Sequence, residues 1–410
     1  MGFLRPARQY NSSSRLFRTA ILYRKWIGVL LLLLTVEVIF HIRSFVTVRP
    51  SVRLDAPFPS SCDFPSLSTT ARANATLFML ARNSDVEGAV DSVKNVQGQF
   101  NDQFGYGWVF LNDEQWSTDF VTRTFETIPK NMWGYPGWID QARAKSSMRT
   151  MERQRIMYAG TESYHHMCRF QSGFFFRHPA LTPYKYYWRV EPSIQLTCRI
   201  PYDPFVAMAQ HKKRYGYTIA LWEKGQTAPS LFRKLSEYKK RLRMPTTSLW
   251  IVMKAPSYVP WPFRSAMKWL RNRDEKGDLW NMCHSWSNFE IADMDFFRSE
   301  GYTDLFNFLD KDGGFYYERW GDAPVHSLAA AMLLKPEEVH HFSDFGYAHG
   351  GLQYCAVAST EEAKRKGLLV PVHEEDMSGD IGCQCKCDPG IRIVEPVWRW
   401  GFCLGRLRNL

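Results

Sequence analysis

The chain has 410 residues, of which 45% are hydrophobic, 23% charged and 15% aromatic, so it can bury a large core and is neither a small stapled peptide nor globally disordered. The formal net charge is +11, but the segment up to Arg53 holds nine Lys or Arg and one acid, a net of +8. The remaining +3 is spread over the rest of the chain, so we expect no nucleic-acid partner.

An apolar run from Trp26 to Ile42 follows six Lys and Arg residues and is interrupted by Glu37. Its 17 residues are at the lower limit of a membrane span and exceed a typical signal-peptide core. No small-residue cleavage site follows, and more basic residues precede the run than follow it. The pattern predicts a signal-anchor helix at 26–42, with a cytosolic tail at 1–25 and a lumenal remainder. A cleaved signal peptide is the alternative.

Residues 43–73 are rich in Pro, Ser and Thr and show no helical period. Such a segment cannot bury enough apolar surface to fold alone, so it predicts a lumenal stem. The folded domain is then expected at 74–410. Asn74 begins the sequon Asn-Ala-Thr where the stem ends, and is a candidate for glycosylation in a lumen.

Nine cysteines are consistent with an oxidising compartment. Cys383, Cys385 and Cys387 form a cluster that could bind zinc, but the spacing is a weak zinc pattern and disulfides are favoured. The pairings cannot be deduced from the sequence. Because the count is odd, at least one thiol is free or intermolecular, and Cys62 is a candidate for an intermolecular bond.

The folded part begins with the pattern of a strand, a helix and a second strand. Short apolar strands are predicted at 75–81 and 107–111, and Ser84 or Asp85 is a candidate cap of the helix between them. Five apolar side chains are expected on one face of that helix: Val86, Val90, Val93, Val96 and Phe100. This pattern indicates an α/β fold in which a right-handed crossover joins parallel strands.

Polar residues follow both of these strands, at 82–85 and 112–114. Ligands bind at the carboxyl ends of strands in such sheets, so Arg82 and Asp113 are candidate substrate-binding residues. Neither a G-x-G-x-x-G nor a Walker A motif occurs, which argues against a dinucleotide oxidoreductase or a P-loop enzyme. A nucleotide held by side chains fits these strand ends; ordinary caps and turns are the alternative.

The stretch Y-K-Y-Y-W-R-V-E-P at 184–192 predicts an aromatic strand that ends at a carboxylate and a proline. Glu191 is therefore expected at a strand end facing a cleft, where it could bind a metal. A divalent ion held mainly by a substrate diphosphate needs only one or two protein ligands. The alternative is a turn glutamate paired with Arg189.

Further carboxylates lie among aromatic residues: Glu290 in 284–291, and Glu318 and Asp322 in 315–327, near His326. Asp322 could also be only the cap of a following helix, because Pro324 stands near its first turn. Carboxylates beside aromatic rings suit sugars, which offer hydroxyls and apolar faces. These residues suggest a glycan-directed enzyme or lectin without deciding between hydrolase and transferase.

Four blocks of this sequence closely resemble the fungal Kre/Ktr/Mnt α-1,2-mannosyltransferases, glycosyltransferase family 15. They are Y-H-H-M-C-R-F from Tyr164, W-R-V-E-P from Trp188, W-S-N-F-E-I from Trp286 and Y-E-R-W-G-D-A-P-V-H-S from Tyr317. The resemblance runs in order from about Asn74 to Cys403. It implies a type II Golgi membrane enzyme with a GT-A-like α/β fold around a mixed, mainly parallel sheet.

The resemblance also implies the reaction. Mannose would move from GDP-mannose to mannose on N-linked or O-linked glycans of secretory and cell-wall glycoproteins, with Mn²⁺ and with retention of configuration. The alternatives are an inactive, lectin-like Golgi protein that binds glycans, and a glycoside hydrolase that uses two carboxylates. Dependence on the nucleotide separates the transferase from both.

By motif, the resemblance implies that Glu191 and His349 contact the metal and that Tyr164 binds substrate. Glu290 would lie beneath the anomeric carbon, and Asp322 would help to hold the catalytic site. Whether Glu290 attacks covalently or stabilises an ion pair stays open. A structural role is the alternative for each residue: His349 as a hydrogen bonder, Tyr164 in the core and Glu290 at a helix start.

Residues 241–281 depart from the pattern expected of the family and are interpreted as an insertion. Variable loops in such enzymes usually surround the acceptor cleft, so this insertion is expected to bear on acceptor choice.

Overall fold

The computed structural model describes residues 12–46, 58, 62, 72–117, 124–261, 263–356, 382–394 and 403–408. Side chains at both ends of the first helix, at 12–22 and 43–46, are not among them. Most of the predicted stem and the start of the predicted cytosolic tail lie outside the described residues.

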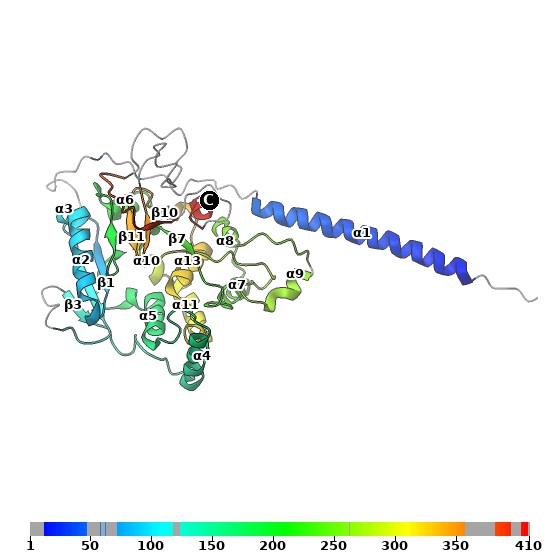
Figure 1. Cartoon of the computed structure of the whole chain (residues 1–410), viewed down its shortest axis with the longest axis horizontal. Coiled ribbons are helices and arrows are strands. Elements are labelled where there is room, and N and C mark those ends of the chain that lie inside the picture. The colour runs from blue at the N-terminus through cyan, green and yellow to red at the C-terminus, as the bar shows by residue number, and fades with distance from the viewer. Residues whose placement is uncertain are drawn as a thin grey trace, which may run out of the picture.

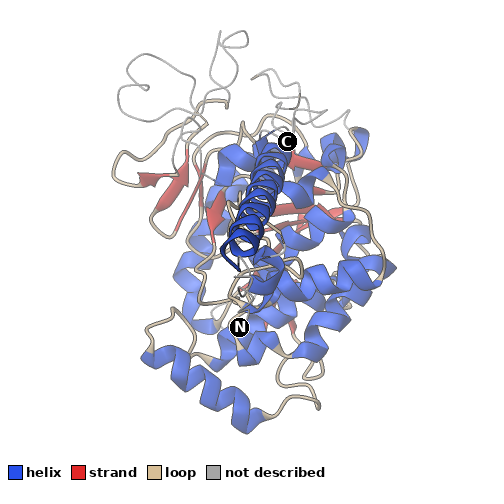
Figure 2. Ribbon diagram, turned by 90° about the vertical axis from the view of Figure 1, so that its right-hand side faces the viewer, coloured by secondary structure: helices blue, strands red, loops and turns tan. Residues whose placement is uncertain are grey.

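The first helix, α1 (Ser12–Val46), is longer at both ends than the predicted anchor at 26–42. Within it, Tyr23–Ile42 is long and apolar enough to cross a membrane, and this window is not buried by the rest of the chain. Figure 1 shows α1 extending away from the folded body, and Figure 2 shows it projecting toward the viewer. A solvent-exposed helix of Leu, Val and Ile is stable only where its apolar surface meets lipid or another protein.

A central sheet of seven strands forms the core of the folded body. Its order is β10 (Val339–His341), β6 (Tyr215–Tyr217), β9 (Glu290–Asp293), β4 (Tyr186–Arg189), β1 (Ala75–Leu80), β2 (Gly107–Asn112) and β3 (Thr124–Thr127). Among the described strands of this sheet, only β9 breaks the parallel pairing, because it is antiparallel to both of its neighbours, β4 and β6. The predicted α/β fold with a mixed, mainly parallel sheet is confirmed.

The predicted strand–helix–strand unit at the start of the domain is confirmed. The strands β1 and β2 are parallel neighbours, with Thr76 opposite Gly107, and α2 (Val86–Val96) lies between them in sequence. The predicted apolar face of α2 is partly wrong, because Val90 is exposed and the buried face runs through Ala89, Ser92 and Val96. Both faces of β1 are buried, as expected for a parallel strand covered on two sides.

The other helices pack around this sheet. They are α3 (Asp102–Phe104), α4 (Gln141–Arg153), α5 (Glu162–Gly173), α6 (Pro204–Gln210), α7 (Leu231–Arg241), α8 (Ser248–Val252), α9 (Phe263–Ala266), α10 (Met294–Arg298), α11 (Glu300–Asp312), α12 (Gly314–Tyr317), α13 (Asp322–Leu333) and α15 (Cys403–Arg408). Of these, α13 is buried along nearly its whole length, consistent with its Ala- and Leu-rich sequence.

Two smaller sheets complete the fold. One has the order β13 (Arg392–Ile393), β12 (Leu352–Tyr354), β11 (Tyr347–His349) and β5 (Gln195–Leu196), and the other pairs β7 (Ala220–Trp222) with β8 (Cys283–Ser285). The strand β5 follows β4 closely in the chain, and β11 pairs with β5. The first small sheet therefore lies next to the end of β4.

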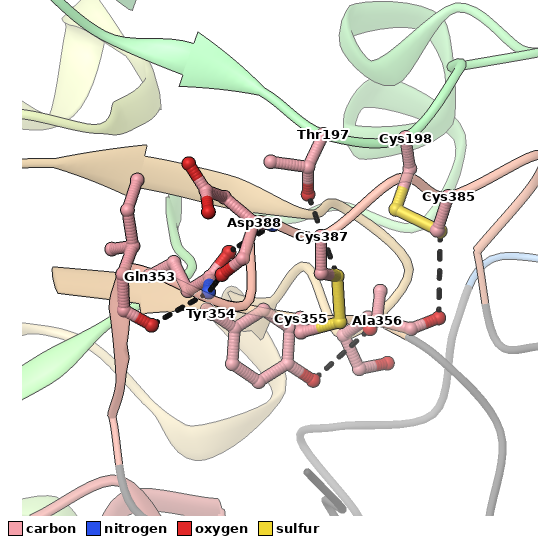
Figure 3. The surroundings of a disulfide bond; sticks show 11 residues. Thr197, Cys198, Gln353, Tyr354, Cys355, Ala356, Cys385, Cys387 and Asp388 are labelled. Atoms are coloured by element: carbon pink, nitrogen blue, oxygen red, sulfur yellow. Dashed lines mark hydrogen bonds between the residues drawn. A yellow bond between two sulfur atoms is a disulfide. The ribbon is translucent and has the colours of Figure 1, made fainter. Parts of the chain in front are cut away.

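Four disulfides join distant parts of the chain: Cys62–Cys383, Cys198–Cys385, Cys283–Cys403 and Cys355–Cys387. Figure 3 shows two of them fastening the segment at 382–394 to β12 and to the loop after β5, where Gln353 also hydrogen-bonds the carbonyls of Asp388 and Ile391. The disulfides leave Cys168 as the one free cysteine, and it is buried. The suggestion that Cys62 forms an intermolecular bond is therefore wrong, and the preference for disulfides over zinc is confirmed.

The folded body holds four described residues of the predicted stem: Phe58, Cys62, Arg72 and Ala73. Cys62 is bonded to Cys383, and Phe58 is 5% exposed with its ring stacked on His340 at a centroid distance of 3.9 Å. The ring of Phe342 meets the same Phe58 side chain edge-on. The chain is therefore in contact with the body before Asn74.

Candidate active site

A cavity of about 490 Å³ lies at the carboxyl edge of the central sheet, where β1, β2 and β4 end. Five of the residues predicted from the sequence line it together: Arg82, Asp113, Tyr164, Glu191 and His349. They come from segments as far apart as 82 and 349, so only the fold brings them together. The first turn of α5 also lines this cavity through Thr161, Ser163 and Tyr164.

Arg82 is fixed at the end of β1 by Asp85. The guanidinium donates from Nε and Nη2 to the two carboxylate oxygens of Asp85, at 3.0 and 3.1 Å. These hydrogen bonds raise the pKa of Arg82 and keep it charged. Asp85 holds the N-cap position of α2, as predicted, but its side chain binds Arg82 and makes no cap hydrogen bond to the helix. The same contact presents a fixed positive charge to the cavity.

Asp113 follows β2 on the same edge. Partial burial raises the pKa of its carboxyl, although the Arg82 charge opposes that rise. A desolvated carboxylate at a strand end is a good acceptor for ligand hydroxyls, because little water competes for it.

Tyr164 lies in the first turn of α5 between two partners. Its ring stacks on Tyr158 with centroids 4.9 Å apart, and its hydroxyl accepts a hydrogen bond from Arg319 Nη1 at 3.0 Å. A second bond, from Arg319 Nη2 to Glu223 at 3.1 Å, holds the guanidinium. Burial raises the pKa of Tyr164 well above its ordinary value, so the hydroxyl stays protonated.

The backbone of the cavity wall is strained at two positions. Tyr158 and Ser193 both line the cavity and have φ values of +60° and +62°, a left-handed conformation that side-chain-bearing residues rarely adopt. Ser193 is held there by a bond from its N–H to the Gly88 carbonyl at 2.9 Å, and any side chain at Gly88 would collide with it. Six other non-glycine residues of the described chain also have positive φ, so this conformation supports the site only together with the residues around it.

Glu191 and His349 face the cavity from β4 and β11. One Glu191 oxygen accepts from Arg189 Nε at 2.7 Å, and the buried Nδ1 atom of His349 has no hydrogen-bond partner. A carboxylate oxygen and an imidazole nitrogen suit Mn²⁺. Within the described part of the chain, no three His, Cys, Asp or Glu side chains gather as a metal cluster. Such an ion would therefore need further oxygen ligands from a substrate.

Arg189 connects Glu191 to Asp322 behind the cavity wall. Its Nη1 lies 2.5 Å from Asp322 Oδ2, which also accepts from Ser287 at 2.7 Å. Burial by itself lowers the pKa of Arg189, but the charges of Asp322 and Glu191 outweigh it and raise that pKa. Burial by itself raises the pKa of Asp322, but Arg189 outweighs it, so the net effect is a lowered value. Asp322 does not cap α13, so that alternative is wrong.

Glu290 does not line the cavity and is 0% exposed. Its Oε2 accepts from the Tyr187 hydroxyl at 2.7 Å, and its Oε1 lies 2.9 Å from His326 Nδ1. His326 Nε2 lies 3.0 Å from the Gln171 carbonyl, which can only accept, so Nε2 carries a hydrogen. The hydrogen bond between His326 Nδ1 and Glu290 Oε1 therefore needs a proton either on Nδ1 or on the carboxyl group.

Two other predicted features lie away from the cavity. Asn74 is exposed beside β1, and its Nδ2 donates to the Pro183 carbonyl at 2.8 Å. No described residue of 241–281 lines the cavity, and Arg264 from this insertion instead contacts Glu37 of α1. The expectation that the insertion surrounds the ligand site is not met at this cavity.

Several residues of the site were missed. Tyr158, Ser193 and Trp133 line the cavity, Arg319 holds Tyr164, and Tyr187 holds Glu290. Arg319 and Tyr187 stand inside motifs already singled out, so the signal was present for them. Nothing in the local sequence marks Tyr158, whose place depends on a turn with positive φ.

A comparison with known families agrees with the resemblance seen in the sequence motifs. Residues 52–371 match the model of a family described as glycolipid 2-alpha-mannosyltransferase. The chain belongs to this family. The predicted family and the prediction of a glycosyltransferase are confirmed, and the findings do not favour the lectin-like alternative.

Members of this mannosyltransferase family from several fungi cover most of the chain. Glycolipid 2-alpha-mannosyltransferase 1 of Candida albicans is 44% identical over 366 residues, which are 87% of this chain and 76% of the relative. The solved core-mannan synthase A of Aspergillus fumigatus, in a Mn/GDP form, has a TM-score of 0.63 and 34% identity over 73% of this chain and 83% of its own. The mannosyltransferase Ktr4p of Saccharomyces cerevisiae, in complex with GDP, has a TM-score of 0.67 and 30% identity over 91% of this chain and 88% of its own.

Proposed function

We propose that the chain is a retaining α-1,2-mannosyltransferase that transfers mannose from GDP-mannose to mannose on N-linked or O-linked glycans. The cavity carries this proposal, because it gathers the Arg82 guanidinium, three carboxylates, an imidazole and the partly buried Tyr164 at the carboxyl edge of a mainly parallel sheet. Solved relatives that contain GDP, one of them with manganese, support a nucleotide donor.

Glu191 and His349 would hold Mn²⁺ together with the diphosphate oxygens of the donor. The bound ion would neutralise the charge that develops on the leaving GDP. Arg189 limits the position of Glu191, because it holds one carboxylate oxygen at 2.7 Å. Arg82 would add a positive charge near the nucleotide, and Asp113 would accept hydrogen bonds from hydroxyl groups.

Tyr164 would position the sugar or the acceptor from the first turn of α5. Its hydroxyl accepts from Arg319, so its own hydrogen remains to be donated to a ligand oxygen. The stacked pair of Tyr158 and Tyr164 would offer an apolar surface to a sugar face.

Glu290 and Asp322 would act from behind the wall as buried charges. Both oxygens of Glu290 are occupied by Tyr187 and His326, which favours electrostatic stabilisation of the anomeric carbon over covalent attack. Asp322 would hold Arg189 and, through it, Glu191.

The location proposed is the Golgi membrane, with α1 as a single-pass type II anchor, the catalytic domain in the lumen and a glycan on Asn74. The apolar span Tyr23–Ile42 and its position near the N-terminus support the anchor. The disulfides support an oxidising lumen.

The test is a transfer assay on the detergent-solubilised full chain. It is incubated with GDP-mannose, Mn²⁺ and α-methyl mannoside, with and without chelator, and the product linkage is read by NMR. We expect an α-1,2-linked disaccharide that forms only with the metal. Absence of GDP binding would instead favour the hydrolase or the lectin-like alternative.

Two variants separate the roles of the carboxylates. Glu191→Ala should weaken Mn²⁺-dependent GDP binding, whereas Glu290→Gln should abolish transfer and leave GDP binding unchanged. The control is Glu87→Ala, which removes an exposed carboxylate on α2 and should change neither. Full turnover in both site variants would overturn the assignment of these residues.

A further inference from the structure

The insertion at 241–281 carries a cluster of exposed apolar side chains. Each is more than half exposed: Tyr258, Trp261, Phe263, Trp269 and Leu270. Single exposed apolar residues are ordinary, but five within 13 positions of one segment are not. We call these five residues the aromatic cluster.

The aromatic cluster lies next to the end of α1 that faces the body. Arg264, between Phe263 and the end of α9, contacts Glu37 of α1 with Nη2 3.1 Å from Oε1. Its Nε lies 3.0 Å from Asp278, and the same carboxylate lies 3.6 Å from Nε2 of His41 in α1. Figure 1 shows α9 beside this end of the long helix.

These contacts set the depth of the insertion relative to the apolar span. Glu37 lies five residues before Ile42, where the span ends, and this is about 7.5 Å along a helix axis. The Arg264 guanidinium, which reaches Glu37, therefore lies below the level at which the span ends. Interfacial helices bury their apolar faces to a comparable depth of about 5–10 Å.

The ion pair also accounts for a charge inside the span. An unpaired carboxylate there would be costly, and paired intramembrane charges are the usual solution. Arg264 is 8% exposed and supplies the positive charge from outside α1. Among α1 residues, Leu34, Glu37, Val38 and His41 are partly covered while most of their neighbours are exposed, which identifies the face toward the insertion.

The chemistry around the aromatic cluster is that of a membrane interface. Trp and Tyr concentrate at the headgroup level, and Lys and Arg contact lipid phosphates. The Lys268 ammonium lies 4.8 Å from the Trp269 ring centroid, and Arg271 is exposed next to it. An adjoining cavity of about 790 Å³ is lined by Trp261, by six basic residues and by Asp274 and Glu275, which pair with Lys254 and Lys240.

We propose that the aromatic cluster is a second membrane-contact site, which inserts into the headgroup region of the same bilayer that α1 crosses. This inference rests on the proposed anchor. The catalytic body would then be held by two contacts at the membrane instead of moving freely on a stem. None of the five residues lines the catalytic cavity.

The test measures how deeply the aromatic cluster enters the bilayer. The full chain is reconstituted in vesicles of phosphatidylcholine with a minority of phosphatidylserine, carrying one nitroxide label at a time, at Trp269→Cys, Leu33→Cys or Val90→Cys. The one native free thiol, Cys168, is buried and does not compete for label. Val90 is exposed on α2, far from α1 in Figure 1, and is the aqueous control.

The accessibility of the nitroxide to oxygen is high in lipid, and its accessibility to a water-soluble nickel complex is high in water. We expect the oxygen-to-nickel ratio at 269 to be several times that at 90 and below that at 33. Equal ratios at 269 and 90, with a lipid-like label at 33, would overturn this inference and leave the anchor intact. An aqueous label at 33 would instead overturn the anchor, and the inference with it.

A second variant tests the cause of the signal. Adding Trp261→Ser and Phe263→Ser to the labelled chain should lower the ratio at 269 toward the aqueous value. Transfer to soluble α-methyl mannoside should stay unchanged, which shows that the variant is folded. A ratio that remains lipid-like would mean that the two side chains do not carry the contact.

Discussion

Arg189 links Glu191, which lines the cavity, to the buried Asp322 behind the cavity wall. It binds Glu191 on one side and Asp322 on the other, and its own side chain is 6% exposed. Removing one partner of a buried ion pair leaves the other as an uncompensated charge, which costs more than the pair itself contributes. The position is therefore as important for stability as for the placement of Glu191.

We predict that Arg189→Met lowers the free energy of unfolding at pH 7 by about 3–5 kcal/mol. Arg189 lowers the pKa of Asp322, and a lowered carboxyl pKa contributes stability above the unfolded-state value that is lost as pH falls through the folded-state value. The variant lacks this contribution, so the difference from the native chain should shrink as the pH falls below about 4.

Urea unfolding at pH 7 and at acid pH measures this difference. The control is Arg149→Met on the exposed face of α4, which should change stability by less than about 0.5 kcal/mol at either pH. A stability difference that stays constant with pH would mean that Arg189 does not lower the pKa of Asp322.

Sequence reasoning at this scale succeeded where a residue sits at the end of a local pattern. Glu191 could be placed because an aromatic strand and a proline flank it. The burial of Glu290 could not be deduced, because Tyr187 and His326, which enclose it, are 103 and 36 positions away. Glu191 was expected either to face a cleft or to pair with Arg189, and in the structure it does both.

At the scale of elements, the local signals were sufficient for β1, α2 and β2 but not for β9. The sequence Glu-Ile-Ala-Asp at 290–293 has no strand pattern, and it forms a strand because β4 and β6 pair with it on both sides. Such a pairing is a tertiary effect that overrides propensity. The place of residues 241–281 beside α1 depends on contacts with Glu37 and His41 that no local pattern encodes.

The stem is the element for which the structure changes the interpretation most. We predict that Phe58→Ala destabilises the chain by about 3–5 kcal/mol, because it removes a 5% exposed ring that stacks on His340. Thermal unfolding of the full chain measures the effect. Phe263→Ala is the matched control, since that ring is 60% exposed, and it should change stability by less than about 0.5 kcal/mol. Equal losses in the two variants would mean that Phe58 makes no packed contact in solution.

At the scale of the whole molecule, with α1 as the proposed anchor, the orientation of the cavity relative to the membrane depends on how the body is attached. A flexible stem alone would let the body rotate freely. The contacts of α1 with Arg264 and Asp278, together with the Cys62–Cys383 bond, restrict that freedom. A restricted body presents its cavity to glycans at a fixed angle, which favours some acceptors by position in addition to contact.

We therefore predict that Glu37→Gln frees the body from α1. The variant removes the charge that attracts Arg264 but leaves the Arg264–Asp278 pair, at 3.0 Å, to keep the insertion folded. With spin labels at Ile27→Cys in α1 and Val90→Cys in α2, the full chain in nanodiscs should give a narrow distance distribution by pulsed EPR. That distribution should broaden in Glu37→Gln and stay narrow in the control Arg271→Gln, which removes an exposed charge of the same insertion. A distribution equally narrow in Glu37→Gln would show that the ion pair does not orient the body.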